Sequence, residues 1–419
     1  MNILLINHYA GSPTHGMEFR PYYLAREWVR AGHQVQIVAA SHSHIRACQP
    51  PLEAGQIKDE LIDDIQYRWY PTPAYTGNGV GRVKNMLSFI RQLWGDAKPL
   101  ANGFKPDVVI ASSTYPMDIW PAQRIARLAG ARLVYEVHDL WPLSPMELGG
   151  MSRWHPFIIW VQWAEDHAYK HADRVVSMLP KTLDYMVSRG LAPEKWAYVP
   201  NGVDLAEWQS PPDLPSAVQS TLLQLKARGL PIVGYAGTHG LANALDVLLD
   251  AAAQLKGQAE VLLVGKGPER ERLQQRVTDE GLDNVAMLPS VPKASIPKLL
   301  EQIDIAYIGW HPNPLYRFGI SPNKLVDYMM AGKPIVHSVS AGNDPVQEAG
   351  CGLTVPPADA AAVASAVRQL GGLETHARQA LGLKGKQYVM QNRLYPTLAQ
   401  NFLCAVTANK TWSSESVLK

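Results

Sequence analysis

Short runs of β-branched and other apolar residues alternate with longer segments of helical periodicity along the whole chain. This alternation is typical of parallel sheets whose strands are joined by crossover helices, so we expect an α/β fold. The runs that should form strands are residues 3–7, 35–39, 108–111, 133–137, 175–178 and 197–199 in the first half, and 232–235, 261–264, 285–288, 305–308 and 335–338 in the second half.

Both halves follow this plan, which predicts two Rossmann-like domains. A chain of 419 residues is long enough for each domain to bury its own core. The proline-rich stretch from Asp204 to Pro231 separates the halves and is expected to be a linker followed by an approach helix. Ligands of such domains bind at the carboxyl ends of the strands, which would meet in a cleft.

Composition limits the class of partner. The apolar fraction of 47% is ordinary for soluble globular proteins, and the net charge of +2 is too small to indicate a nucleic-acid partner. Cys48, Cys351 and Cys404 lack metal-ligand spacing, which favours a reducing cytoplasm. Met1–Asn7 has no basic segment and is expected to be a buried strand, not a signal peptide. No apolar run reaches the ~20 residues of a membrane span, so we expect a cytoplasmic protein, soluble or bound at a membrane surface.

Residues Gly319–Pro334 (GISPNKLVDYMMAGKP) should form a short helix that could bind an anion and a sugar. Pro322 suits a first helical turn, so Ser321 is expected to be the N-cap. Free backbone N–H groups and Lys324 would form the anion site, and Asp327 on the same side of the helix could bind sugar hydroxyls. The alternative is a capped surface helix whose polar residues are only solvated.

Two glycine-containing loops of the second half each follow a predicted strand. In Tyr235–Gly240 (YAGTHG) the glycines would allow a close backbone approach, and the next helix, expected over residues 241–255, would attract negative charge at its N-terminus. Gly265–Glu269 (GKGPE) opens another helix, but Arg270 stands where a dinucleotide fingerprint has its third glycine. Either loop could be a plain strand-to-helix turn, and Lys266 could be a solvated cation.

Two segments of the first half also follow predicted strands. Gly11–Gly16 leads to a helix expected to begin near Glu18, and His138 and Asp139 end the fourth strand. Glu18 and Arg20 could contact a substrate or could be helix-terminal charges. His138 could face the cleft or be a hydrogen-bonded packing residue.

Four further segments add to residues 319–334 by their order and spacing: Gly32–Val35 (GHQV), Tyr135–Asp139 (YEVHD), Ala172–Val176 (ADRVV) and Val199–Asp204 (VPNGVD). The set resembles the retaining glycosyltransferases of family four, in the branch that builds bacterial surface polysaccharides. The resemblance implies the GT-B fold, in which two Rossmann-like domains have parallel sheets that face across a cleft. It implies an acceptor-binding domain over 1–205 with a C-terminal crossover helix in 388–419, and a nucleotide-sugar domain over 206–387.

The resemblance also assigns roles. Asp327 would bind the ribose, and Lys324 with Arg317 would supply positive charge. Family members usually have an Arg and a Lys after the first strand of the second domain and two acidic residues separated by seven; here residues 238–243 lack those cations and Gly319 stands at the first acidic position. The donor-binding residues would be Gly16, Gly237, Thr238, His239, Gly240, Gly265, Lys266, Gly267, Arg317, Ile320, Ser321, Pro322, Asn323, Lys324 and Asp327.

For the chemistry, the resemblance implies front-face attack, in which the leaving diphosphate helps to deprotonate the acceptor and positioned cations stabilise the departing charge. His138, Asp139 and Lys324 would be the catalytic residues, and Glu18 and Arg20 would meet the acceptor. The chain contains no Asp-x-Asp triplet, so we expect neither a metal nor another cofactor.

The favoured interpretation is a transferase that moves a sugar, with a UDP-sugar as the expected donor, to a glycan or polyprenyl-linked acceptor at the inner face of the cytoplasmic membrane. Two alternatives remain open: an epimerase of nucleotide sugars with the same fold, and a silent glycan-binding or scaffold subunit. Nucleotide release with and without acceptor would separate the three.

Two segments of the first half suggest contact with a membrane surface. Residues 81–94 interleave Arg82, Lys84 and Arg91 with large apolar residues, and residues 151–163 are rich in Trp and Ile. Both suit an interfacial helix. Equally, their apolar faces could pack on the first domain.

Overall fold

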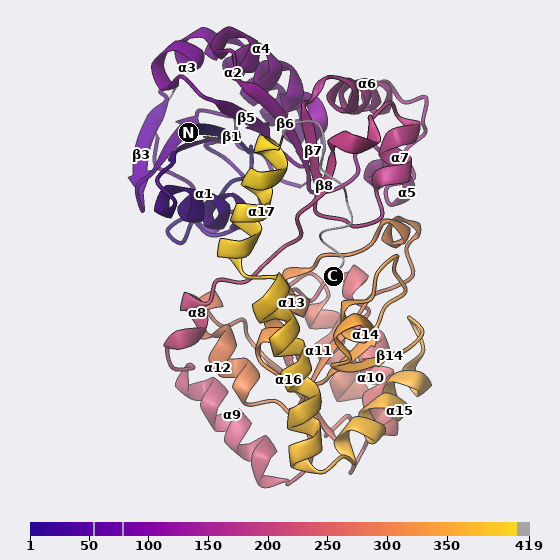
Figure 1. Ribbon diagram of the computed structural model, residues 1–419. Helices are drawn as coiled ribbons and strands as arrows, with labels where there is room; N and C mark the ends of the chain where they lie inside the picture. Colours follow the sequence, from indigo (N-terminus) through magenta and orange to yellow (C-terminus); the bar gives the residue numbers. More distant parts are fainter. Residues whose placement is uncertain (53–54, 78, 409–419) are drawn as a thin grey trace. The chain divides into compact units, whose positions relative to one another are not determined.

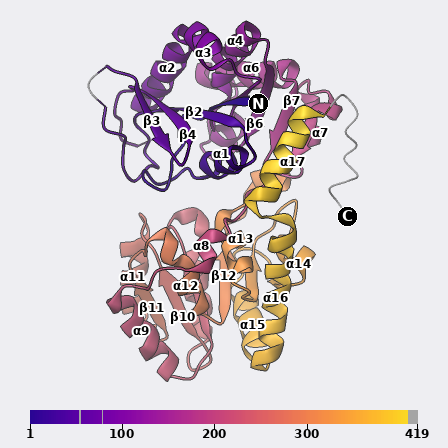
Figure 2. The same cartoon turned by 60° about the vertical axis from the view of Figure 1, so that its left-hand side comes forward.

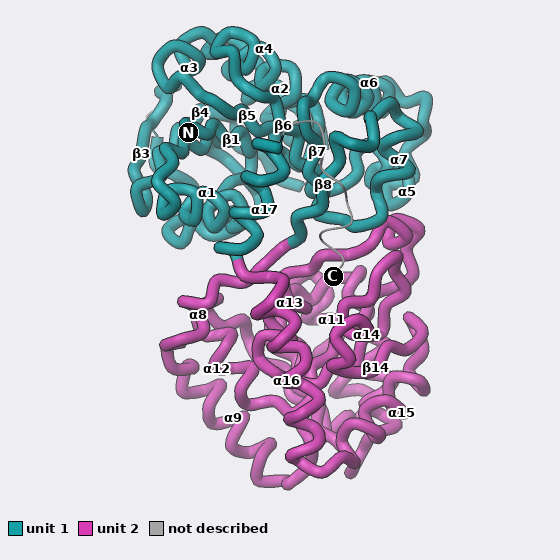
Figure 3. Tube along the Cα trace, in the orientation of Figure 1, with its two compact units in different colours: residues 1–200, 395–419 teal, residues 201–394 magenta. Residues whose placement is uncertain are grey.

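The computed structural model describes residues 1–52, 55–77 and 79–408, which form two compact units. Unit 1 comprises Met1–Pro200 and the chain from Tyr395 onward, and unit 2 comprises Asn201–Leu394 (Figure 3). The predicted boundaries at residues 205 and 387 differ from these by five and seven residues. The difference has a physical cause, because Val203 pairs with Leu394 as a β-bridge, which keeps both residues in unit 2.

Unit 1 is built on an eight-stranded sheet with the order β3-β4-β2-β1-β5-β6-β7-β8 (Figure 1). All neighbours pair in parallel except β3 and β4. Its strands are β1 (Asn2–Ile6), β2 (Gln34–Ala40), β3 (Lys58–Ile62), β4 (Ile65–Tyr70), β5 (Val108–Ala111), β6 (Arg132–Val137), β7 (Arg174–Ser177) and β8 (Trp196–Tyr198). Its helices are α1 (Arg20–Arg30), α2 (Val80–Gly95), α3 (Ala97–Phe104), α4 (Ile119–Ala129), α5 (Leu143–Glu147), α6 (Pro156–His171), α7 (Leu183–Ser188) and α17 (Tyr395–Thr407), with 3₁₀ turns η1 (Pro116–Asp118) and η2 (Pro193–Lys195).

Unit 2 contains a six-stranded parallel sheet with the order β11-β10-β9-β12-β13-β14 (Figure 2). The strands are β9 (Ile232–Ala236), β10 (Glu260–Val264), β11 (Val285–Leu288), β12 (Ile305–Gly309), β13 (Ile335–Ser338) and β14 (Gly352–Thr354). The helices are α8 (Ala206–Gln209), α9 (Ser216–Ala227), α10 (Leu245–Gln254), α11 (Arg270–Asp279), α12 (Ile296–Glu301), α13 (Asn323–Met330), α14 (Pro345–Ala349), α15 (Ala360–Gly371) and α16 (Thr375–Asn392), with 3₁₀ turns η3 (Leu241–Asn243), η4 (Lys293–Ser295) and η5 (Pro314–Phe318).

The sheet of unit 2 has an apolar core on each face. Successive side chains of a strand point to opposite faces, so Ile232 of β9 joins the core that includes α9, α12 and α13, whereas Val233 joins the core that includes α10 and α15. A strand buried on both faces must be apolar along its whole length. This is why the apolar runs predicted the strands well.

All eleven predicted runs form strands whose ends lie within one residue of the prediction. Three strands were missed, namely β3, β4 and β14. The first two form an antiparallel hairpin, in which Asp63 and Asp64 take the left-handed backbone conformation that tight hairpin turns require. The expectation of purely parallel sheets is therefore wrong at this edge of unit 1.

The expected final helix is two helices. Helix α16 ends at Asn392 in unit 2, and α17 begins at Tyr395 and packs in unit 1. Pro396 explains the break, because proline has no backbone N–H to continue the hydrogen bonds of α16, whereas it is tolerated in the first turn of a new helix. Trp28 Nε1 of α1 donates a hydrogen bond to the Ala399 carbonyl at 3.1 Å, and the rings of Tyr23 and Tyr395 stack with centroids 4.6 Å apart.

Candidate active site

A buried carboxylate organises the carboxyl edge of the sheet in unit 1. Glu136, near the end of β6, is 1% exposed and accepts hydrogen bonds from Arg20 Nε at 2.9 Å and from Ser112 Oγ at 2.6 Å. Burial alone would raise the pKa of Glu136, but the charges of Arg20 and His138, with the hydrogen bonds from His138 and Ser112, lower it to about 2. Glu136 therefore stays ionised at neutral pH.

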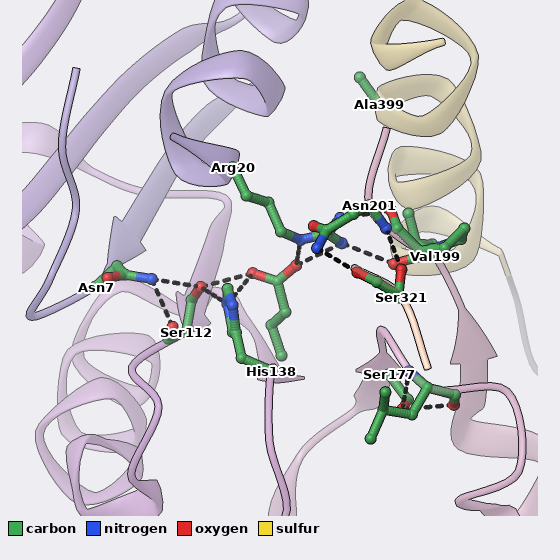
Figure 4. Close-up of polar contacts among 12 residues, drawn as sticks. Asn7, Arg20, Ser112, His138, Ser177, Val199, Asn201, Ser321 and Ala399 are labelled. Atoms are coloured by element: carbon green, nitrogen blue, oxygen red, sulfur yellow. Dashed lines mark hydrogen bonds and ion pairs between the residues drawn. The ribbon is translucent and has the colours of Figure 1, made fainter. Parts of the chain in front are cut away.

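His138 forms a hydrogen bond to this carboxylate through one ring nitrogen. Its Nε2 lies 2.9 Å from Ser112 Oγ and 3.2 Å from Glu136 Oε2, and Figure 4 shows Ser112 and His138 side by side. Because Glu136 is ionised and the Ser112 hydroxyl donates to it, Nε2 must carry the proton that is shared with these acceptors. In the neutral ring Nδ1 is then an acceptor, and it makes no hydrogen bond to any described residue.

Arg20 lies buried beside Glu136. It is 1% exposed, and besides Glu136 its guanidinium donates to the carbonyls of Pro200 at 2.6 Å and Val199 at 2.8 Å (Figure 4). Arg20 therefore compensates a buried carboxylate and links the end of the first segment of unit 1 to α1, and its expected contact with the acceptor stays a prediction. The geometry gives it a positioning role.

Glu18 and Gly16 lie in the loop before α1. The helix begins at Arg20, not near Glu18, and Glu18 is half-buried, with its carboxylate 3.4 Å from the Arg20 backbone nitrogen. Gly16 has a left-handed backbone conformation, and a Cβ there would lie 2.9 Å from the Cβ of Ala47, so glycine is required for this loop packing. Neither contact tests the expected roles toward donor and acceptor.

Asp139 holds a local turn. Its Oδ1 accepts hydrogen bonds from the Leu140 backbone at 2.9 Å and from Ser144 Oγ at 2.7 Å, just before and within α5. Of His138 and Asp139, two of the three predicted catalytic residues, the structure brings only His138 into the Glu136 cluster. Sequence reasoning missed Glu136 itself, although a glutamate inside an apolar strand two residues before His138 was a usable signal.

In unit 2 the two glycine loops pack backbone against backbone. The His239 nitrogen donates to the Lys266 carbonyl at 2.9 Å, and the Glu269 nitrogen donates to the His239 carbonyl at 3.0 Å. A Cβ at Gly265 would overlap the Gly237 carbonyl, and one at Gly267 would overlap the His239 backbone. The glycines are therefore needed for the two loops to touch, as well as for any approach to a ligand.

His239 lies buried between these loops, and neither ring nitrogen has a hydrogen-bond partner among the described residues. Burial lowers its pKa to about 4, assisted by the charges of Arg270 and Lys324. The ring is therefore neutral at physiological pH. The helix expected over 241–255 is the 3₁₀ turn η3 followed by α10, with Gly240 immediately before the turn.

Lys324 reaches from α13 to the end of β9. Its Nζ donates to Tyr235 Oη at 2.7 Å and Asn243 Oδ1 at 2.8 Å, and a Cβ at Gly237 would lie 3.1 Å from it. Burial lowers the pKa of Lys324 to about 7. Tyr328, one turn later on α13, accepts from the Ala236 nitrogen at 2.8 Å. Two successive turns of α13 thus hold two successive residues of β9, and no local pattern indicated Tyr235 and Asn243 as partners of Lys324.

The expected N-cap is wrong. Helix α13 begins at Asn323, Pro322 precedes it in an extended conformation, and no side chain caps the helix. Ser321 is engaged elsewhere, because its Oγ accepts from the Asn201 nitrogen at 2.9 Å and its carbonyl accepts from Asn201 Nδ2 at 2.8 Å (Figure 4). The first backbone N–H groups of α13 thus donate no hydrogen bond to the Ser321 side chain.

Asp327 lies on α13 near the ion pair of Lys293 and Glu207, whose charged atoms are 2.8 Å apart. Burial raises the pKa of Asp327 to about 7, partly offset by the charge of Lys293 and assisted by that of Glu207. Within the described residues its carboxylate makes no hydrogen bond or ion pair. It is therefore available for a hydroxyl ligand.

The remaining residues that were predicted to bind the sugar donor differ in their burial and hydrogen-bond partners. Arg317 is exposed and stacks on Phe318, with its guanidinium carbon 4.3 Å from the ring centre. The Ile320 nitrogen donates to Asn343 Oδ1 at 2.7 Å, and the Ile320 carbonyl accepts from Asn343 Nδ2 at 3.2 Å. Lys266 and Asn323 are exposed, and the Thr238 carbonyl accepts from Tyr235 Oη at 2.7 Å. Gly237, Thr238 and Lys324 thus meet at one point, and Gly265 and His239 pack against the same loop.

No group of three or more His, Cys, Asp and Glu side chains in residues 1–52, 55–77 and 79–408 is arranged to hold a metal ion. Among the helices of this described part, none combines the length and the apolar character needed to cross a bilayer.

Comparison with known proteins identifies both halves of the chain. A Glycosyl transferase 4-like domain matches residues 15–202, and a Glycosyl transferases group 1 domain matches residues 230–371. An alpha-D-kanosaminyltransferase of Streptomyces kanamyceticus is 25% identical over 255 residues, which cover 59% of this chain and 63% of that protein. The chain thus matches somewhat less than two thirds of that relative.

Solved structures resemble the whole chain. The Anabaena protein HepE, solved with UDP and glucose, is 19% identical with a TM-score of 0.67, and the match covers 98% of this chain and all of that one. The lipopolysaccharide glycosyltransferase WaaG is 13% identical with a TM-score of 0.65, covering 97% of this chain and all of that one. At these identities the likeness shows the fold alone, and it confirms the GT-B class with two parallel-sheet domains.

Proposed function

Because the chain belongs to the glycosyltransferases that combine a 4-like domain with a group 1 domain, we propose that it moves a sugar from a nucleotide-diphosphate sugar to a glycan or lipid-linked acceptor. The donor nucleotide is UDP, the anomeric configuration is retained, and the product serves cell-surface polysaccharide synthesis on the cytoplasmic side of the membrane. HepE was solved with UDP and glucose, and WaaG takes part in lipopolysaccharide biosynthesis, which supports these choices.

The observation that carries the proposal is the Lys324 ammonium beside the two glycine loops of unit 2. A lysine that is largely buried, with only neutral side chains within hydrogen-bond distance, favours an anionic ligand. A diphosphate supplies that charge. Asp327, three residues later on the same helix, has a carboxylate that can accept hydrogen bonds from ribose hydroxyls.

The residues present support retaining transfer by front-face attack. In this scheme the bond between the sugar and the leaving diphosphate breaks, the acceptor oxygen bonds to the same face of the sugar, and its proton passes to the diphosphate. Lys324 stabilises the negative charge on the leaving group. His138, fixed through Nε2 by Glu136, contacts the sugar or acceptor through Nδ1.

Released nucleotide is the direct test. We expect UDP release from a UDP-sugar that increases when an acceptor is present, with unchanged rates in EDTA. The anomeric configuration of the product, read by nuclear magnetic resonance, would equal that of the donor. An epimerase would interconvert donor sugars without a glycan product, and a silent subunit would bind without turnover.

Membrane association is part of the proposal, and one face of unit 1 supports it. This aromatic face consists of Leu87 and Trp94 on α2, Trp120 and Arg124 on α4, and Ile159 and Trp163 on α6. Leu87, Trp94, Ile159 and Trp163 are 44 to 62% exposed, Arg124 stacks on Trp94 at 4.8 Å, and Trp120 lies 4.9 Å from Trp163.

Exposed Lys84 and Arg91 lie on α2 with this face. Of the other apolar residues of the two segments, Phe89 and Val161 are buried in unit 1, whereas Trp154 is 71% exposed, so packing on unit 1 accounts for only part of each segment. Exposed Trp and Ile beside cations suit a surface of anionic lipid.

A further inference from the structure

The Lys324 ammonium donates hydrogen bonds to two neutral side chains, and both of these side chains donate to the same backbone carbonyl. Tyr235 Oη accepts from Nζ and donates to the Thr238 carbonyl at 2.7 Å, while Asn243 Oδ1 accepts from Nζ and Asn243 Nδ2 donates to the same carbonyl at 3.0 Å. Nζ also lies 4.4 Å from the centre of the Tyr235 ring. All three side chains therefore converge on the loop that begins at Gly237.

No carboxylate compensates this charge. The ion pairs of the described residues include none with Lys324, although a buried cation is normally paired. An amide and a hydroxyl satisfy its hydrogen bonds without neutralising it. Burial therefore disfavours the protonated lysine in the free site, and a bound anion would stabilise it.

We propose that Tyr235 and Asn243 are positioning residues that hold the uncompensated charge of Lys324 beside Gly237 for the diphosphate of the nucleotide donor. This inference rests on the proposed transferase function and deepens it. Asn243 has to be neutral, because a carboxylate at this position would pair with Lys324 and repel the diphosphate.

A proton uptake follows from this arrangement. Burial places the pKa of Lys324 near 7, so at pH 8.5 the free protein holds it mostly neutral, and a bound diphosphate raises its pKa. The surrounding groups do not titrate there: burial raises the pKa of Tyr235, the His239 pKa is about 4, and the Asp327 pKa is about 7. Arg270 also faces this site, because its charge contributes to the lowered pKa of His239. Binding should take up about one proton at pH 8.5.

The test is calorimetry of UDP binding at pH 8.5 in two buffers that differ in ionisation enthalpy. Asn243→Asp should weaken UDP binding by at least about tenfold and abolish the proton uptake, because the new carboxylate keeps Lys324 protonated before binding. Tyr235→Phe removes one oxygen and should weaken binding about three- to tenfold. Asn392→Asp, the same change at the end of α16, is the matched control and should behave as wild type.

Wild-type affinity and wild-type proton uptake in Asn243→Asp would overturn the proposal, and an unaffected Tyr235→Phe would remove Tyr235 from it. Should Asn243→Asp fail to fold, the wild-type protein still decides, because UDP binding without proton uptake at pH 8.5 would overturn the proposal. A wild-type protein that binds none of UDP, GDP and ADP and releases no nucleotide would overturn the proposed function itself. The two failures are thus distinguishable.

Discussion

The Nε2 atom of His138 lies 3.2 Å from Oε2 of Glu136, which stands two residues earlier on the same edge of the sheet. Since Arg20 and Ser112 also bind this carboxylate, the imidazole is oriented by a group that remains ionised. A histidine held in this way presents a defined nitrogen to a ligand. It can act on the sugar or acceptor without contacting the diphosphate.

His138→Ala should therefore lower kcat more than nucleotide affinity. We expect a fall in kcat of about 10²-fold or more, the range typical of a positioned catalytic side chain, with the Kd for UDP within about threefold of wild type. Steady-state kinetics and calorimetry measure the two quantities. His171→Ala, at an exposed histidine of α6, is the control. Equal losses in both quantities would place His138 on the donor instead.

Asp327→Asn should weaken nucleotide binding and leave the fold intact. Loss of a hydrogen bond to a charged group costs roughly 1.5–3 kcal/mol, or about ten- to a hundredfold in affinity. Because burial raises the pKa of Asp327 to about 7, its carboxylate ionises between pH 6 and 8. Its contribution to UDP affinity should rise over that interval, and the difference between wild type and variant should grow with pH. Unchanged affinity in Asp327→Asn, with Asp279→Asn as the surface control, would reject the ribose assignment.

Arg20→Met should destabilise unit 1 by about 3–5 kcal/mol, because it leaves a buried carboxylate uncompensated. The double variant Arg20→Met with Glu136→Gln should recover part of this loss, as measured by urea unfolding in a double-mutant cycle. The low pKa of Glu136 stabilises the fold above pH 4.5, and this term disappears as the pH falls toward 2. If Arg20→Met had normal stability and a raised KM for the acceptor, Arg20 would instead be a residue that contacts the acceptor.

The aromatic face of unit 1 should bind anionic liposomes at low salt and release them at high salt. Lys84→Glu with Arg91→Glu should weaken co-sedimentation several-fold, and Trp163→Ala should weaken it at every salt concentration. Arg82 is the weaker choice for this variant, because its guanidinium already contacts Tyr9 Oη at 3.1 and 3.2 Å. Lys384→Glu with Lys386→Glu on α16 is the matched control. A wild-type protein that stays in the supernatant at low salt would indicate an acceptor in solution.

The sequence by itself determined the α/β class, the eleven apolar strands and the two-domain plan. Strands buried on both faces have to be apolar throughout, and this requirement is visible residue by residue. The same holds for Lys324 and Asp327, whose places on one short helix follow from local spacing. The β3–β4 hairpin was missed because Asp59, Glu60, Gln66 and Arg68 interrupt its apolar residues, and the Asp63–Asp64 turn was its main signal.

Only the tertiary structure decided which polar groups meet. Arg20 and Glu136 are 116 residues apart, and Asn243 and Lys324 are 81 apart, so no local pattern could reveal either pair. Ser321 was expected to cap α13, but Asn201, 120 residues away, takes its hydroxyl. Hydrogen bonds and ion pairs form between whichever groups the fold brings within about 3 Å, whereas the strand pattern depends on burial that every residue of the strand shares.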